Sequence, residues 1–294
     1  IFGTADGNLF HRGLNRNTAY AAAPVATATV PTIVAISGSG PNDVTVARRD
    51  PSRPLSRFDG KVWSAAPTPP PETVINDVWV ASNGDVWTAS NGGRVYRNGI
   101  KITNGLSGSF NAVVLGGAAK DDVWAANDNA DIVRYTGVSF STMGNPMLNP
   151  IRGIYARNNT EAWFVGDKVQ LYQWTPSNSF VSKMVSGVSS TVNYLAISGV
   201  PGTGDIWLVG TSGTAARWNG SLWTKVDALT TRNLTSVVAI ANNDVWLVGD
   251  GGTVRHWNGT SIETPNIGVN DPLPTTNSSA LNRIWAASAT DIWA

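Results

Sequence analysis

The sequence predicts an all-β fold, a seven-bladed β-propeller whose blades are four-stranded antiparallel sheets. A motif of an acidic residue, a small or β-branched residue and then Trp or Thr recurs every 37 to 47 residues, and seven such units account for all 294 residues. Short apolar segments separated by Gly, Asn and Asp fill each unit. A period in the forties with Trp-bearing strands is typical of propellers. The motifs begin at Asp43, Asp85, Asp122, Glu161, Asp205, Asp244 and Asp291.

The clearest unit spans residues 234–262 and shows why each unit should form one blade. Residues 234–240 predict an apolar first strand, 244–249 a second and 253–257 a third. Asn258-Gly259 is a tight-hairpin signal that leads into an outer strand ending at Ile262. One such sheet cannot bury both of its faces alone, so the motif Trp is expected to fill the layer between neighbouring blades.

The two ends of the chain together complete one repeat. Residues 291–294 begin a second strand, and residues 1–11 read as its end followed by a turn and a third strand. We therefore expect the last blade to be closed by N- and C-terminal strands, and residues 1–294 to form a single propeller domain without an open sheet edge.

The composition excludes several classes of protein. Charged residues are only 14%, below the ~25% of ordinary soluble domains, and the net charge of +1 gives no reason to expect nucleic acid or an anionic membrane as partner. With no Cys there is no disulfide framework and no thiolate zinc site. Apolar runs are too short for membrane insertion. This composition fits a secreted, periplasmic or cell-surface protein, whose signal peptide would already be trimmed because the chain starts at Ile1.

Residues 244–259, reading DVWLVGDGGTVRHWNG, resemble the repeats of bacterial secreted seven-bladed β-propellers. They are more distantly similar to regulator-type sensor propellers and to photosystem-assembly-factor-like propellers. Residues 78–87 with 93–97 also resemble a tectonin repeat, which is a lectin pattern. The resemblance implies the propeller fold, and its tectonin part implies carbohydrate binding. Because propellers serve many activities, the fold alone does not imply one.

Two further columns of polar residues repeat around the ring. The leading acids are expected to cap turns through backbone amides. A hydrogen-bond donor precedes the third-strand aromatic, and we expect it to bond a neighbouring strand or the turn acid; the alternative is a ring of donors that binds an anion or a sugar. The donors are Arg57, Arg134, Gln173, Arg217 and His256, with Arg97 and His11 at matching places.

The first strands should line the central channel, and each opens with polar residues. Uncharged amides with an occasional Arg suit hydroxyl-rich or peptide ligands, whereas the alternative is that Asn simply starts a turn. The opening column is Asn76, Asn111, Arg152, Asn193, Thr235 and Asn282. The next position holds Asp77, Tyr194, Ser236 and Arg283.

The longest connections should emerge on one face, where function usually lies on a rigid scaffold. They span residues 14–29, 48–54, 65–72 and 266–279. One of them carries a basic cluster, Arg48, Arg49 and Arg53 with Arg57 nearby, which would suit a carboxylate or sulfate; a solvated loop is the alternative. No cofactor is expected. Calcium is the one candidate ion, because residues 127–131 (NDNAD) cluster oxygen ligands, although without the full alternating spacing.

These observations predict a non-catalytic binding module that recognises a glycan or a cell-surface protein through the long-loop face and the channel mouth. One alternative is a polysaccharide-acting hydrolase or lyase that uses Asp77, Arg152, Tyr194 and Arg283 at that mouth. Another is a sensor or assembly propeller that only docks proteins. The sequence leaves the ligand and the oligomeric state open.

Overall fold

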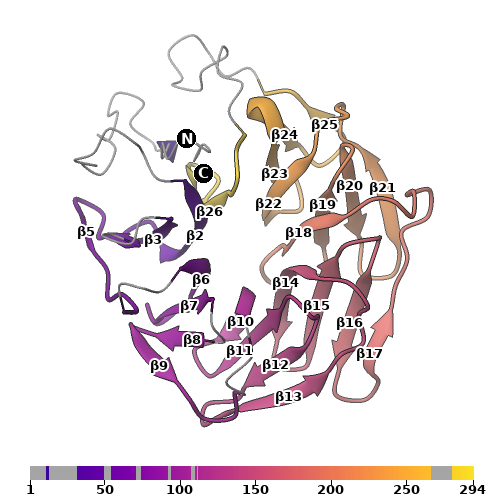
Figure 1. Cartoon of the computed structure of the whole chain (residues 1–294). Coiled ribbons are helices and arrows are strands. Elements are labelled where there is room, and N and C mark those ends of the chain that lie inside the picture. The colour runs from indigo at the N-terminus through magenta and orange to yellow at the C-terminus, as the bar shows by residue number, and fades with distance from the viewer. Residues whose placement is uncertain are drawn as a thin grey trace.

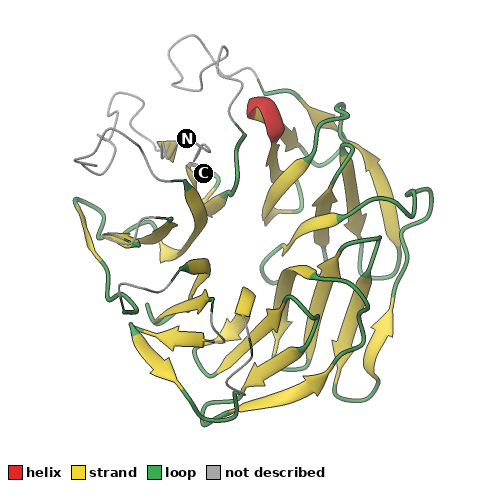
Figure 2. Cartoon of the chain, viewed as in Figure 1, coloured by secondary structure: helices red, strands yellow, loops and turns green. Residues whose placement is uncertain are grey.

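Antiparallel sheets follow one another around a ring, each with its first strand toward the centre (Figure 1). The computed structural model describes residues 11–12, 32–49, 54–70, 74–91, 94–106, 110, 112–265 and 280–294. In this part of the chain the structure is almost wholly strand and loop (Figure 2). Its one helical segment is a short 3-10 turn, η1 (Asp250–Gly252). No helix among the described residues is long and apolar enough to cross a membrane.

Six sheets are four-stranded, and we number them blades 1 to 6 in chain order. Blade 1 contains β2 (Ile33–Gly40), β3 (Asp43–Arg48), β4 (Leu55–Phe58) and β5 (Trp63–Ala65). Blade 2 contains β6 (Ile75–Val80), β7 (Val86–Ser90), β8 (Arg94–Arg97) and β9 (Ile100–Ile102). Blade 3 contains β10 (Ala112–Ala119), β11 (Asp122–Asn127), β12 (Ile132–Tyr135) and β13 (Phe140–Gly144).

The second half of the ring has the same construction. Blade 4 contains β14 (Ile151–Asn158), β15 (Glu161–Gly166), β16 (Leu171–Thr175) and β17 (Ser179–Ser182). Blade 5 contains β18 (Tyr194–Gly199), β19 (Ile206–Gly210), β20 (Thr214–Trp218) and β21 (Trp223–Asp227). Blade 6 contains β22 (Leu234–Ala241), β23 (Asp244–Gly249), β24 (Thr253–Trp257) and β25 (Ile262–Glu263).

The predicted number of seven blades is wrong, because the described residues form six four-stranded blades. The remaining strands make a three-stranded sheet in the order β1-β27-β26, here called the terminal sheet. It contains β26 (Trp285–Ser288), β27 (Asp291–Trp293) and β1 (His11–Arg12), which pairs with β27 through His11↔Trp293. The repeated motif marks the second strand of a unit. The number of motifs therefore equals the number of repeat units, but the motif does not indicate whether a unit has a fourth strand.

The motif Trp residues fill the layers between sheets, as predicted. Trp87, Trp124, Trp163, Trp207 and Trp293 are all fully buried. Each contacts an aromatic ring that belongs to the third strand of the next blade: Trp124 lies 4.9 Å from Trp174, Trp207 lies 5.2 Å from Trp257, and Trp293 lies 5.3 Å from Phe58. Because these contacts join adjacent sheets, each blade depends on its neighbour for its core.

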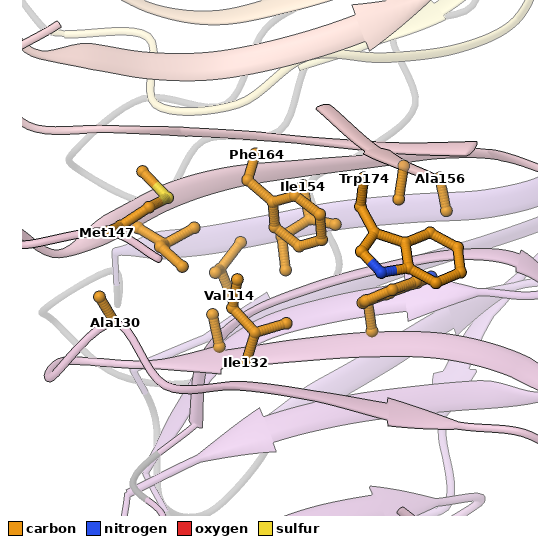
Figure 3. Packing of buried hydrophobic residues seen from close by; sticks show 12 residues of the cluster. Val114, Ala130, Ile132, Met147, Ile154, Ala156, Phe164 and Trp174 are labelled. Carbon is orange, nitrogen blue, oxygen red and sulfur yellow. The ribbon is translucent and has the colours of Figure 1, made fainter. Parts of the chain in front are cut away.

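The layer between blades 3 and 4 illustrates this packing (Figure 3). Val114 and Ile132 of blade 3 face Ile154 and Phe164 of blade 4, and Met147, from the connection between the two blades, closes one end of the cluster. The side chains are apolar and nearly solvent-free. Their burial is the main source of stability between blades, because the strands of different four-stranded sheets do not pair with one another.

Side-chain hydrogen bonds also join the innermost strands of neighbouring sheets. The Ser37 hydroxyl accepts from the Val80 amide at 2.9 Å, and the Ser198 hydroxyl accepts from the Ala239 amide at 3.1 Å. Elsewhere an aromatic ring replaces the serine: a Cβ added to Gly117 would come within 2.6 Å of the Trp79 ring. Glycine there lets the ring of blade 2 lie directly on the backbone of blade 3.

Candidate functional site

The antiparallel order places two kinds of loop on the same face. Strands alternate in direction within a blade, so the turns between second and third strands share one face with the connections between blades. We call this the upper face, and the opposite one the lower face. Every innermost strand starts at the upper face. Its opening residues therefore lie at the upper mouth of the channel.

The register shows which opening residues are equivalent. Each blade starts its first strand on a buried apolar residue or tyrosine, followed by a bulged residue. The first positions are Ile33, Ile75, Ala112, Ile151, Tyr194 and Leu234. The polar column expected from the sequence therefore mixes two positions. Asn193 and Tyr194 lie two residues earlier than Asn76 and Asp77, and Asn111 lies outside the described residues.

Most polar bulge residues bond the next sheet around the channel. The Asn76 amide donates to the Ala112 carbonyl at 2.8 Å, and the Asn282 amide donates to the Ile33 carbonyl at 3.2 Å. The Thr235 hydroxyl donates to the Leu281 carbonyl in the same way. The polarity of these three positions is thus used within the ring.

Arg152 is different, because it forms an ion pair at the mouth of the channel. Its guanidinium makes two contacts with the Asp167 carboxylate, at 3.0 and 2.7 Å, and its side chain stays 48% exposed. The hydrogen bond to Asp167 raises the pKa of Arg152, against the opposing effect of burial. The pair presents the most accessible charge among the predicted site residues that the structure describes, apart from Arg49.

The β15–β16 turn, residues 166–170, brings three predicted site residues together. Asp167 binds Arg152 from one side. The Lys168 amide donates to Asn193 Oδ1 at 3.0 Å, and the Val169 amide donates to the Val192 carbonyl at 2.8 Å. Tyr194 is the residue after Asn193, and it lines a cavity together with Val169. Arg152, Asn193 and Tyr194 therefore surround one turn.

That turn is strained. Lys168 and Val169 both have φ of 55°, in the left-handed region that a β-branched residue such as Val rarely adopts. The residues equivalent to Val169 in the next two blades are Gly213 and Gly252, whose φ values are 66° and 69°. Strain of this kind persists only where the surroundings hold it, and it is concentrated at functional sites. This sector of the upper face, residues 166–170 with Arg152, Met184, Asn193 and Tyr194, is the candidate site.

Asp77 of β6 and Arg283, which lies just before β26, are a second pair of opposite charges. The Asp77 carboxylate accepts the amides of Val78 and Leu115, both at 2.9 Å. Burial raises the pKa of Asp77, although the positive charge of Arg283 and the two amides act in the opposite direction. Tyr194 belongs instead to the core between blades 4 and 5. The four residues considered for catalysis therefore do not converge on one point.

The described members of the basic cluster do not form an exposed patch. Arg48 is buried and donates to the Ser56 hydroxyl at 2.9 Å, whereas Arg57 is paired with Asp43 at 2.6 Å. Arg49 is exposed, and Arg53 lies outside the described residues. The long segments 14–29 and 266–279 also lie outside them.

The two repeated polar columns bond to each other on the second and third strands. In each of the six blades the repeated donor bonds the repeated acid, which confirms the prediction that the donors bond the turn acid. The prediction for the acids named only backbone amides as their partners and did not include this pairing. The pairs are Arg57–Asp43, Arg97–Asp85, Arg134–Asp122, Gln173–Glu161, Arg217–Asp205 and His256–Asp244. Around Asp85, hydrogen bonds from Asn83, Asn98 and Arg97 outweigh burial and lower its pKa to about 2.

The oxygen-rich turn at residues 127–131 is held by its own hydrogen bonds. Asn127 Oδ1 accepts the amides of Asn129 and Asp131, and its side-chain amide donates to the Asp131 carboxylate at 2.8 Å. No group of three or more His, Cys, Asp or Glu side chains that could hold a metal ion occurs in the described ranges.

Sequence reasoning missed Lys168, Val169 and Met184. A signal was present for Val169: the turns of the two following units carry Gly-rich strings, TSGT and DGGT, where this unit reads DKVQ. A turn that loses its glycine while keeping its length indicates either a different turn or a tolerated strain.

Comparison with solved structures identifies the fold. YCF48 bound to the D1 peptide superposes with a TM-score of 0.65 at 14% identity, covering 100% of this chain and 98% of that one. Selenomethionine-substituted virginiamycin B lyase from Staphylococcus aureus gives 0.70 at 16% identity, covering 97% and 98%. The WD40 β-propeller domain of Doa1 gives 0.69 at 11% identity, covering 96% and 92%. At these identities the likeness shows the propeller fold alone.

An extracellular domain is among the similar structures. That of the hybrid two-component system BT4673 from B. thetaiotaomicron gives a TM-score of 0.68 at 14% identity, covering 90% of this chain and 37% of that one. A scan against protein-family models finds no match, and neither does a comparison with curated proteins.

Proposed function

We propose that this protein is a binding module that holds a polypeptide segment on the upper face of blades 4 and 5. The observation that carries the proposal is the convergence of Arg152, Asn193 and Tyr194 on a strained turn that exposes Lys168. Apolar anchors beside a few fixed polar groups are the usual composition of a recognition site. Met184 adds an 83% exposed thioether side chain next to the turn.

One comparison and one set of hydrogen bonds favour a polypeptide over a glycan. A propeller with the same fold over the whole chain, YCF48, has been solved with a peptide bound. In this chain the amide and hydroxyl groups of Asn76, Thr235 and Asn282 already bond the next sheet. One donor of each side chain is therefore already used within the ring, which leaves fewer donors for sugar hydroxyls.

The binding experiment has two arms. A phage-displayed random peptide library is panned on the purified protein, and the same sample is applied to a glycan array. We expect specific peptides from the first arm and no saturable binding in the second. Specific glycan binding without peptide binding would replace this proposal with a lectin.

Variants then locate the site. Lys168→Ala and Arg152→Ala should weaken the selected peptides about tenfold each, equivalent to ~1.4 kcal/mol. Lys120→Ala is the matched control, because Lys120 is also exposed but lies in a lower-face turn and should leave binding unchanged. Peptide binding that is insensitive to both upper-face variants would move the site elsewhere.

The proposal includes a location outside the cytoplasm, on the cell surface or secreted. It is supported by the absence of cysteine, by the low content of charge and by the extracellular domain with the same fold. Fractionation of the source cells, with protease added to intact cells, tests it. Protein recovered only from the protected cytoplasmic fraction would contradict this location.

A further inference from the structure

A cavity of about 270 Å³ opens on the upper face between blades 4 and 5. Val169 lines it from the β15–β16 turn, Met184 and Val188 from the connection between β17 and β18, and Tyr194 from β18. We call it the Tyr194 pocket. Its volume lies just below the range of sites for drug-sized ligands, so it suits one bulky side chain.

The hydroxyl of Tyr194 has no hydrogen-bond partner among the described residues. Only 1% of the residue is exposed, and burial by itself raises the pKa of the phenol to about 12. The hydroxyl is thus a hydrogen-bonding group that the protein itself leaves unused, whereas most polar groups in such largely buried residues are bonded within the protein. The other blades and the terminal sheet carry an aliphatic residue at this position, so packing alone does not require the hydroxyl: Ile33, Ile75, Ala112, Ile151, Leu234 and Leu281.

Val169 gives the cavity a wall at the expense of backbone strain. In blade 5 the equivalent Gly213 could not carry a side chain, because a Cβ there would collide with the Thr230 carbonyl oxygen. In blade 4 the connection to the next blade is longer, residues 183–193 compared with 228–233, and leaves the space in which Val169 lines the pocket. The space beside this turn is therefore filled by backbone in blade 5 and left as a cavity in blade 4.

The ligand follows from these walls. Val169, Met184 and Val188 offer apolar contact, and a thioether is a favourable neighbour for an aromatic ring. Tyr194 offers one hydroxyl that makes no hydrogen bond to the described residues. A ring of suitable size with a hydrogen-bonding atom satisfies both, whereas an aliphatic side chain would leave the hydroxyl without a partner.

We propose that the Tyr194 pocket is an anchor site for a single phenolic ring, the side chain of a tyrosine in the bound polypeptide. This inference rests on the proposed function for the source of the tyrosine. The pocket itself can be tested separately with a small phenol.

The probes are p-cresol, which is the tyrosine side chain, and toluene, which is the same ring without the hydroxyl. Binding is followed by amide chemical shifts in NMR spectra of the full chain. We expect p-cresol to shift the amides of residues 183–194 and to bind roughly threefold to tenfold more tightly than toluene, as one net hydrogen bond allows.

Two variants separate binding from folding. Tyr194→Phe removes only the hydroxyl, so the preference for p-cresol over toluene should disappear. Val169→Gly removes a wall and relieves the positive-φ strain; p-cresol should bind more weakly while the melting temperature does not fall. A preference that survives Tyr194→Phe, or shifts confined to residues outside the pocket, would overturn the inference.

A competition links the pocket to the proposed function. If peptides selected by phage display bind the upper face and p-cresol displaces them, both statements hold. If those peptides bind and p-cresol neither binds nor competes, the pocket inference fails and the proposed function stands. If p-cresol binds but no peptide does, the proposed function fails and the tyrosine source with it.

Discussion

His256 is the residue at which the ring becomes sensitive to pH. It occupies the position that holds Arg in four other blades, and both of its ring nitrogens meet carboxylates, Asp244 at 2.9 Å and Glu263 at 3.0 Å. The hydrogen bond to Asp244 raises the pKa of His256, partly offset by burial and reinforced by Glu263. The ring also lies 4.4 Å from the Trp246 ring. Both nitrogens can donate only in the imidazolium form.

The sign of the pH effect follows from this raised pKa. The stabilisation is fully present below the unfolded-state pKa of His, about 6.5, and is lost as pH rises through the higher folded-state pKa. We therefore expect the wild-type protein to exceed His256→Gln in free energy of unfolding at about pH 6 and to lose that margin by about pH 9. Urea titrations of both proteins at several pH values measure this difference in free energy of unfolding. His256→Arg is the control: it keeps the ion pair, and its margin should stay constant across the same range.

Asn76 tests whether the polar channel residues are structural. Blades 1 and 3 carry Val34 and Val113 at the same bulge position, so Asn76→Val replaces the residue by one that this site accepts. It removes the hydrogen bond to the Ala112 carbonyl and should lower the free energy of unfolding by roughly 1 kcal/mol. Peptide binding should not change. A loss of binding with unchanged stability would make Asn76 a ligand contact instead.

At the scale of the element, the strand repeat was predictable and the loop conformations were not. Apolar alternation and Asn-Gly turns fix where strands lie, because these patterns reflect burial that every blade needs. Equivalence at the channel mouth depends on a bulge after the first residue, which no single residue type marks. Polar residues two positions apart were therefore aligned as one column, which displaced Asn193 and Tyr194.

The candidate site depends on how one turn departs from the repeat. The sequence predicts Arg152, Asn193 and Tyr194 as mouth residues, and the structure gathers them around residues 166–170 on the upper face. Lys168 and Val169 were not predicted, because what distinguishes them is a positive φ angle and not a residue type. The burial of Arg48 was likewise unpredictable, since it depends on a contact with Ser56 on the neighbouring strand.

At the scale of the whole molecule, stability depends on the terminal sheet. Trp293 packs against Phe58 at 5.3 Å and Trp63 at 5.7 Å, both in blade 1. Trp293→Ala should lower the free energy of unfolding by about 3–5 kcal/mol, the range for removing a buried Trp. Val62→Ala is the control at a 60% exposed position and should stay within about 0.5 kcal/mol of wild type. Equal losses in both variants would mean that the terminal sheet does not hold the ring.

Several contacts between sheets run in one direction, and this gives the ring a polarity. Asn76 reaches forward to blade 3, Thr235 to the terminal sheet and Asn282 to blade 1, and the motif Trp residues lean the same way. If the terminal sheet detached from blade 1, the two newly exposed surfaces would differ from each other and would be complementary. Two opened molecules could then join head to tail, because an interface between unlike surfaces propagates until it closes. The same geometry that gives a closed monomer would thus assemble an opened one into larger rings or chains.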